Sequence, residues 1–187
     1  MAGRKTADDL RYTKTEISLK NSMIKLLSKK PVKKISIVEL CREAEVNKST
    51  FYLHYRDIYD YYDHLIELIA DEIASVFSRY SYEEIVSNFR EVFFELLNLV
   101  KRNELIRIML SNDNGEEILP KIAATVNNTI IKSGSVPIKN PHAFEIKNYF
   151  TACGIVGVIQ RYSSEIFNSP LLADMLADQI QKGFSQT

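Results

Sequence analysis

A run of polar side chains at residues 48–54 has the chemistry needed to bind a phosphate backbone. The run reads KSTFYLH and carries an ammonium group, two aliphatic hydroxyls, a phenol and an imidazole. Lysine, hydroxyl and backbone N–H groups are the donors that proteins use toward phosphate oxygens. The residues that supply them here are Lys48, Ser49, Thr50, Tyr52 and His54. A protonated His54 would add positive charge, so a modest pH dependence is expected.

These donors need a rigid element to hold them, and the sequence predicts two short helices joined by a tight turn. Ser36 and Glu39 have the spacing of a capping box at the start of the first helix. Asn47 is a good N-cap for the second helix, in which Phe51 and Tyr55 lie four apart and should be buried together. The polar run is then left on the open side of the second helix. In a helix-turn-helix, that second helix enters the major groove of DNA.

The pattern alone also fits an ordinary two-helix corner of an all-helical protein, and charge favours the nucleic-acid reading. Residues 1–56 hold 13 Lys and Arg against 6 Asp and Glu, a net charge of +7. The remaining 131 residues hold 11 against 18, a net charge of −7. A basic lobe is the electrostatic footprint of a nucleic-acid reader. The net charge of zero for the whole chain therefore hides a strong polarisation.

Residues 15–68 resemble the DNA-binding domain of TetR/AcrR-type bacterial transcriptional regulators. The resemblance runs through the first helix, ISIVELCREAEV, NKSTFYLHY and the start of a long helix at Asp57, and its most specific part is TFYxHY at 50–55. It implies an all-helical homodimer in which three N-terminal helices bind a palindromic operator in double-stranded DNA. A larger helical domain then dimerises and usually binds a small effector.

The resemblance also implies roles for single residues. Ser36 would donate to a phosphate, and Lys48 and Ser49 would contact bases or nearby phosphates. Thr50 would touch a phosphate or a thymine methyl group, and Tyr52 and His54 would contact backbone phosphates. The predicted DNA-binding set also includes neighbours of these positions, namely Asn47, Arg56, Lys33 and Lys34. The last two belong to a lysine cluster around Pro31, which is either a solvated loop or a source of phosphate attraction.

Three positions depart from the family's pattern. Glu45 stands in the turn where the family usually has Gly, and a positive φ there would strain a non-glycine residue by on the order of 1 kcal/mol. Val38 stands where a polar DNA contact is common. Ile58 stands where a Lys is common, and nearby Arg56 could replace that contact.

Apolar spacing and turn signals predict an all-α fold of about nine helices. Residues 1–56 are predicted to form the DNA-binding helix-turn-helix domain, and residues 57–187 the helical effector-binding and dimerisation domain. Around the two short helices, the predicted helices span about 14–28, 57–80, 81–101, 104–110, 116–132, 141–165 and 170–183. Capping boxes are expected at Thr13–Glu16 and Ser81–Glu84, a turn at 111–115, and a helix C-cap at Gly134.

The last two predicted helices are the predicted dimer interface. Glycine inside a helix costs about 1 kcal/mol relative to alanine, so two of them three residues apart indicate close approach by another helix. Packing inside the same chain is the alternative, and the resemblance favours the dimer. The residues concerned are Phe150, Gly154, Gly157 and Val158 on one helix and Leu172, Met175 and Leu176 on the other.

The region between the DNA-binding domain and these helices is rich in large apolar side chains, which predicts an apolar or aromatic effector pocket. An ordinary core is the alternative reading of the same residues. The predicted lining is Tyr62, Phe89, Phe93, Met109, Phe144 and Tyr149. An effector that binds the form of the dimer whose DNA-binding domains are wrongly spaced would release DNA, as in a repressor, and activation is the alternative.

Enzymatic, metal-binding and membrane functions find no support in the sequence. No HExxH, GxSxG, glycine-rich phosphate loop or CxxC occurs, so no catalytic residue, cofactor or metal site is expected. Asp60 and His64 are four apart, but two ligands do not make a metal site. Cys41 and Cys153 are predicted to be inert thiols. Without a long apolar run or a signal segment, the chain is expected in the cytoplasm. A helical dimeric interaction protein with weak or lost DNA binding is the alternative function.

Overall fold

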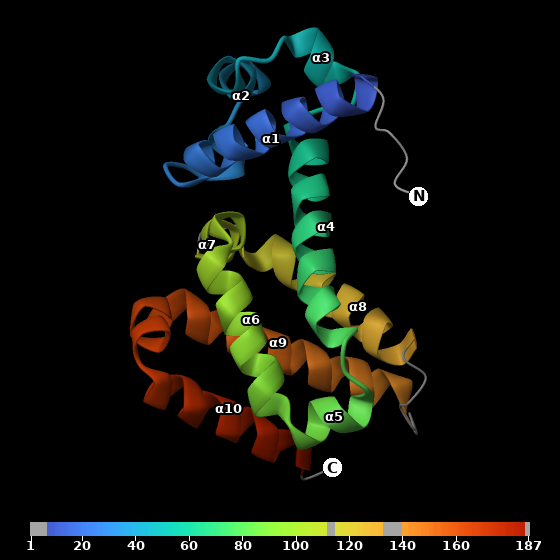
Figure 1. The fold of residues 1–187 in the computed structure, drawn as a ribbon, viewed down its shortest axis with the longest axis vertical. Coiled ribbons are helices and arrows are strands. Elements are labelled where there is room, and N and C mark those ends of the chain that lie inside the picture. Colours follow the sequence, from blue (N-terminus) through green and yellow to red (C-terminus); the bar gives the residue numbers. More distant parts are fainter. Residues whose placement is uncertain (1–6, 112–114, 133–139, 186–187) are drawn as a thin grey trace. The chain divides into compact units, whose positions relative to one another are not determined.

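The computed structural model describes residues 7–111, 115–132 and 140–185 (Figure 1). The chain forms two compact units, residues 1–65 and 66–187. Helix α4 (Ile58–Phe77) begins in the first unit and ends in the second. The units therefore divide later than the predicted functional boundary after Arg56, because the first turns of α4 pack within the N-terminal unit, where Tyr61 contacts Phe51 and Tyr55.

The N-terminal unit is built from α1 (Ala7–Leu27), the 3₁₀ helix η1 (Val32–Lys34), α2 (Ile37–Ala44), α3 (Lys48–Tyr52) and the first turns of α4. Helices α1 and α2 pack against each other, and α3 follows α2 after a short turn (Figure 1). Its core is formed by side chains with no exposed surface, including Leu19, Met23, Leu40, Phe51 and Tyr61. Truncating a buried aromatic residue such as Phe51 costs about 3–5 kcal/mol, so the position of α3 depends on this core.

Two predictions for this unit are wrong in detail. Helix α1 begins at Ala7 rather than near Lys14, so Thr13 lies inside the helix and cannot cap it with Glu16. The predicted loop after Pro31 contains η1, which is held by hydrogen bonds from Lys34 N to Pro31 O and from Ile35 N to Val32 O, both 2.9 Å. The buried side chain of Val32 explains why this segment packs as a turn of helix instead of remaining open.

The C-terminal unit contains the rest of α4 and six further helices. They are α5 (Tyr82–Ser87), α6 (Phe89–Arg102), α7 (Glu104–Ser111), α8 (Gly115–Lys132), α9 (Pro141–Asn168) and α10 (Pro170–Ser185). Helix α9 packs against α8 and α10, and α10 also packs against α6 (Figure 1). The all-α prediction is confirmed over the part of the chain that the structure describes, with ten α-helices and one 3₁₀ helix instead of about nine helices.

The extra helix arises at Asn88, where the single helix predicted for 81–101 is broken. The capping box at Ser81 is confirmed: Ser81 Oγ accepts from Glu84 N at 3.2 Å, and Ser81 N donates to Glu84 Oε2 at 2.7 Å. Asn88 has φ −133° and ψ 43°, outside the helical region. Its side-chain amide binds Glu91 locally. Asparagine competes in this way with the helical backbone, and here it ends α5 and starts α6.

Helices α9 and α10 begin as predicted and run beyond their predicted ends. Asn140 Oδ1 accepts from Ala143 N at 3.1 Å, and Pro141 occupies the first turn, where its missing N–H is harmless. Helix α9 continues to Asn168 but contains one non-helical residue, Tyr162, with φ −129° and ψ 23°. Helix α10 starts at Pro170. Of the turn predicted at 111–115, Ser111 ends α7 and Gly115 begins α8, and residues 112–114 lie outside the described residues, as does the predicted C-cap at Gly134.

Candidate nucleic-acid interface and apolar cavity

Ser36 caps α2, but only half of the predicted capping box forms. Ser36 Oγ accepts from Glu39 N at 3.2 Å. The Glu39 carboxylate turns instead to Lys30, whose Nζ donates to its two oxygens at 2.8 and 2.6 Å and lowers the pKa of Glu39. The Ser36 hydroxyl proton takes no part in the cap, so it can be donated outward. Lys30, in contrast, forms an ion pair with Glu39, so its charge is less available to a phosphate than the charges of the other lysines around Pro31.

The turn between α2 and α3 has the left-handed backbone that the family's glycine position requires. Glu45 has φ 55° and ψ 37°, so of the two conformations that the sequence left open, the structure shows the one with positive φ. Val46 N donates to Cys41 O at 2.9 Å and Glu45 N to Arg42 O at 3.3 Å, the pattern of a Schellman motif. Ser18 Oγ donates to Ala44 O at 2.7 Å and ties this turn to α1. These bonds hold Glu45 in place against a strain of about 1 kcal/mol.

Helix α3 has one buried and one open side, as its spacing predicts. Phe51 is fully buried and Tyr55, just beyond the helix, is nearly so. Lys48 and Ser49 are exposed, Thr50 is half-buried, and Tyr52 is 55% exposed. Leu53 is 78% exposed, which the polar pattern did not indicate. The open side therefore offers polar donors together with one large apolar side chain.

The edges of this surface differ from the sequence-based picture. Asn47 precedes α3 as the N-cap residue, but its side chain makes no capping hydrogen bond. His54 lies in the turn after α3 and not on the helix, and its ring centroid is 4.8 Å from that of Tyr12. Lys33 and Lys34 are exposed on η1, and Val38, near the start of α2, is 53% exposed.

Arg56 is exposed next to the start of α4. Its side chain is 86% exposed, although Nη2 lies 2.9 Å from Asp60 Oδ1. Hydrogen bonds from Arg56 hold the pKa of Asp60 below its usual range. Asp60 therefore faces Arg56, whereas His64 Nε2 lies 3.8 Å from Glu16 Oε2. Over the described residues, no group of three or more His, Cys, Asp or Glu side chains is arranged to hold a metal ion.

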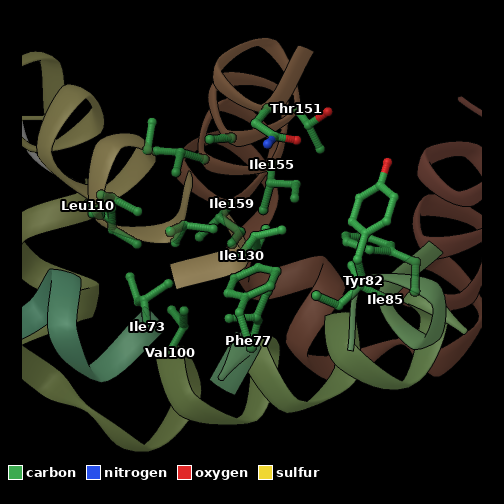
Figure 2. A pocket seen from close by; sticks show the side chains of 18 residues that line it. Ile73, Phe77, Tyr82, Ile85, Val100, Leu110, Ile130, Thr151, Ile155 and Ile159 are labelled. Carbon is green, nitrogen blue, oxygen red and sulfur yellow. The ribbon is translucent and has the colours of Figure 1, made fainter. Parts of the chain in front are cut away.

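The C-terminal unit encloses an apolar cavity of about 100 Å³ (Figure 2). Helices α4 to α9 all contribute to its wall, which is mainly aliphatic. The lining residues are Ile73, Phe77, Tyr82, Ile85, Phe89, Leu96, Val100, Leu110, Ile122, Ala123, Val126, Ile130, Asn148, Thr151, Ala152, Ile155, Val156 and Ile159.

Polar side chains are few in this wall, and two of them, Asn148 and Thr151, come from neighbouring turns of α9. Asn148 Nδ2 donates to Asn127 Oδ1 at 2.6 Å, so the Asn148 carbonyl oxygen is not used in that bond. Thr151 Oγ1 donates to Lys147 O at 2.9 Å, which leaves its lone pairs as acceptors. Tyr82 adds a phenol from α5 (Figure 2). The cavity thus suits an apolar molecule with a donor group at the α9 side.

Exposed apolar side chains gather on α9 and α10. Phe150 is 79%, Met175 58% and Leu172 42% exposed. Gly154 and Gly157 are exposed, and a Cβ added at either would meet nothing within 4 Å. Val158 and Leu176 are half-buried and line a groove between the two helices together with Phe150 and Gly154. All seven predicted interface residues therefore retain surface that a second chain could cover.

Comparison with known proteins supports the fold. No protein-family model and no curated protein matches the chain. Among solved structures, the chain is similar to the crystal structure of a gamma-butyrolactone receptor described as an ArpA-like protein. The likeness covers 93% of this chain and 99% of the receptor, with a TM-score of 0.51 and 13% sequence identity. The chain has the receptor's fold.

The structure does not bring the six predicted pocket residues together. Phe89 lines the cavity, and Phe93 and Met109 are fully buried in the same unit without lining it. Phe144 stacks near Tyr82 with centroids 5.9 Å apart, and Tyr149 lines a separate groove between α8 and α9. Tyr62 belongs to the N-terminal unit. The prediction favoured aromatic side chains, whereas the wall consists mostly of aliphatic residues that are dispersed along six helices.

The two cysteines lie in different units of the chain. Cys41 and Cys153 are both free thiols, and Cys41 is buried, which raises the pKa of its thiol. None of the helices in the described part of the chain combines the length and the apolar character needed to cross a bilayer.

Proposed function

We propose that this chain is a dimeric, sequence-specific DNA-binding regulator of the TetR/AcrR type, and that it acts as a repressor released by a small effector. The observation that carries the proposal is the two-sided α3. Its aromatic side chains Phe51 and Tyr55 anchor it in the core, while Lys48, Ser49 and Tyr52 face solvent. A short helix that is held from behind and open in front can enter a major groove without rearrangement.

The charges around α3 support this role. Lys33, Lys34 and Arg56 are exposed in the same unit as Lys48, and residues 1–56 carry a net charge of +7. Positive side chains bind phosphates and release counterions, which provides affinity and orientation. Sequence preference would come from Lys48 and Ser49 at base edges. Thr50, Leu53 and Val38 could add apolar contacts to thymine methyl groups.

The function is tested by a mobility-shift experiment with purified protein and the intergenic DNA that flanks its own gene. A discrete complex should form, and its affinity should fall by about 10³-fold between about 50 and 200 mM salt if roughly six phosphates are contacted. Absence of any complex across the flanking DNA at low salt would instead support the dimeric interaction protein that does not bind DNA.

The cavity supports an effector that is apolar and small, or one that widens the cavity on binding. A dry cavity of about 150 Å³ holds benzene, so 100 Å³ admits little more than a few heavy atoms. A larger effector would have to bind a form of the unit in which the walls have moved apart. Such an effector would shift the population toward that widened form. DNA binding would be lost if the two DNA-binding domains of the dimer are wrongly spaced in it.

Filling the cavity should remove this binding capacity. Ala123 lines the cavity and is 5% exposed, so Ala123→Leu places three additional carbons in the cavity. With xenon under pressure as the test ligand, the wild type should gain about 1 kcal/mol of unfolding free energy at roughly five times the dissociation constant, or about 2–4 °C in melting temperature. Ala123→Leu should show no gain, whereas the exposed Ala143→Leu should behave as wild type. An equal gain in all three proteins would place xenon outside the cavity.

A further inference from the structure

A cluster of titratable side chains is enclosed in the N-terminal unit where α1, the end of α3 and the start of α4 meet. Glu16 comes from α1, Tyr55 follows α3, and Tyr61 and His64 belong to α4. Tyr55 is 7% exposed and Tyr61 is fully buried. The side chains of Glu16 and His64 keep 18% and 31% of their surface. The cluster lies behind the exposed side of α3, so contact with a phosphate or a base does not explain it.

Glu16 provides the charge to which this cluster responds. Its Oε2 lies 3.8 Å from His64 Nε2, and its Oε1 is buried with no hydrogen-bond partner among the described residues. Burial and then hydrogen bonding with Glu16 raise the pKa of Tyr55, and burial and then the charge of Glu16 raise the pKa of Tyr61. A largely buried carboxylate that has Tyr55 as a hydrogen-bond donor but no partner on Oε1 costs stability, so a positive neighbour has a large effect on it.

Ring contacts connect this carboxylate to the buried side of α3. The centroid of Tyr55 lies 4.7 Å from that of Tyr61 and 5.5 Å from that of His64. Phe51 of α3 lies 5.6 Å from Tyr55 and 6.0 Å from Tyr61 by the same measure. A movement of His64 toward or away from Glu16 therefore changes the contacts that anchor α3 from behind.

We propose that Glu16 and His64 form a protonation-dependent tie that positions α3, with Glu16 and His64 as positioning residues for DNA binding. The inference rests on the proposed function. A protonated imidazole is attracted to the Glu16 carboxylate and a neutral one is not, so the tie is stronger in mildly acidic solution, where imidazoles gain their proton. The pH dependence expected from the sequence at exposed His54 has a different origin, because that residue would meet the DNA directly.

The groups around His64 agree on the sign of this effect. They are Glu16 on α1, Tyr55 after α3, and Asp60 and Tyr61 on α4. Burial raises the pKa of Tyr55 and of Tyr61, so these two phenols are neutral in mildly acidic solution, and the negative charge near His64 comes from the two carboxylates. Asp60 is shared with Arg56, which leaves Glu16 as the carboxylate that responds most to His64.

Amide hydrogen exchange of residues 48–55 tests the tie without DNA. Wild type and His64→Gln are compared at about pH 6 and again at about pH 8, each time at one pH so that intrinsic exchange rates cancel. At the lower pH the variant should exchange about fivefold faster, the upper range for an ion pair near the surface, and at the higher pH the two should agree. Glu16→Gln should reproduce this pattern. The double variant should exchange no faster than either single variant. Lys14→Gln, a change at an exposed lysine of α1, should exchange at the wild-type rate. Equal rates at both pH values, or the same acceleration at both, would overturn the tie.

A second measurement links the tie to DNA and separates its failure from that of the proposed function. The comparison is made in a His54→Gln background, which removes the pH dependence expected from His54 itself. In this background, affinity for the DNA fragment that wild type shifts should be about fivefold higher at the lower pH. Adding Glu16→Gln should abolish this dependence. If the fragment is bound but Glu16→Gln leaves the pH profile unchanged, the positioning role is wrong and the proposed function stands. If wild-type protein binds no DNA at either pH, the proposed function fails and the positioning role with it.

Discussion

Lys48→Ala should weaken binding to the operator by about 10- to 100-fold, because a side chain at the start of the recognition helix contributes on the order of 1–3 kcal/mol. Lys48 is exposed at the first position of α3, so its removal leaves the core of the unit intact. A phosphate contact would also lower the salt dependence by about one counterion, whereas a base contact would relax specificity at one position. Titration of labelled operator at several salt concentrations distinguishes the two.

Tyr52→Phe and Lys132→Ala serve as companions to this experiment. Tyr52→Phe removes a phenol that would donate to a phosphate, and a neutral hydrogen bond of this kind is worth about 1 kcal/mol, or roughly fivefold in affinity. Lys132 is an exposed lysine at the end of α8 in the C-terminal unit, so its removal should leave affinity unchanged. If Lys48→Ala and Lys132→Ala bind alike, α3 is not the element that contacts DNA.

If α9 and α10 form the proposed dimer interface, Gly157→Trp should convert the dimer into monomers, with a dimer dissociation constant raised by about thirtyfold or more, since disruption at the centre of an interface costs about 2 kcal/mol or more. A Cβ at Gly157 meets nothing within 4 Å in the isolated chain, so the subunit itself can accommodate the change. Only a second chain seated against α9 would be displaced. Sedimentation velocity over a concentration series measures the effect, and far-ultraviolet circular dichroism verifies that the helices persist.

Asn98→Trp is the matched control, because Asn98 is exposed on α6 and lies on neither helix of the predicted interface. It should sediment as wild type. A Gly157→Trp protein that remains dimeric at the same concentrations would move the interface elsewhere, and the exposed Phe150, Leu172 and Met175 would then need another explanation. Loss of the dimer should also reduce operator affinity, because two half-sites would no longer be bound together.

The features that the sequence predicted well depend on short-range spacing. The two-sided α3 follows from Phe51 and Tyr55 lying four apart, the capped start of α5 follows from Ser81 standing where a backbone N–H needs an acceptor, and the start of α9 follows from Pro141 at its first position. At Glu45 the sequence left the backbone conformation open, and the structure shows the left-handed one. Each of these depends on chain neighbours within about five residues.

Features that depend on distant parts of the chain could not be predicted in the same way. The lining of the cavity combines residues of six helices, and the choice between Phe89, which lines it, and Phe93, which is buried beside it, is made by rotation of α6 against its neighbours. The failure of Glu39 to complete its capping box likewise required knowing that Lys30 lies within 2.6 Å. Glu16 was predicted only as part of a capping box, because its partners Tyr55 and His64 are brought to it only by folding.

The non-helical residue Tyr162 divides α9 into two helical segments. The N-terminal segment, up to that residue, carries every α9 side chain of the cavity wall, from Asn148 to Ile159. The shorter C-terminal segment is attached to α6, where Lys101 Nζ donates to Phe167 O at 3.4 Å. An interrupted ladder of backbone hydrogen bonds is where a long helix bends most readily. An outward rotation of the N-terminal segment of α9 about Tyr162 would enlarge the cavity, while the C-terminal segment stays attached to α6. A ligand could then enter without detaching the C-terminal end of α9.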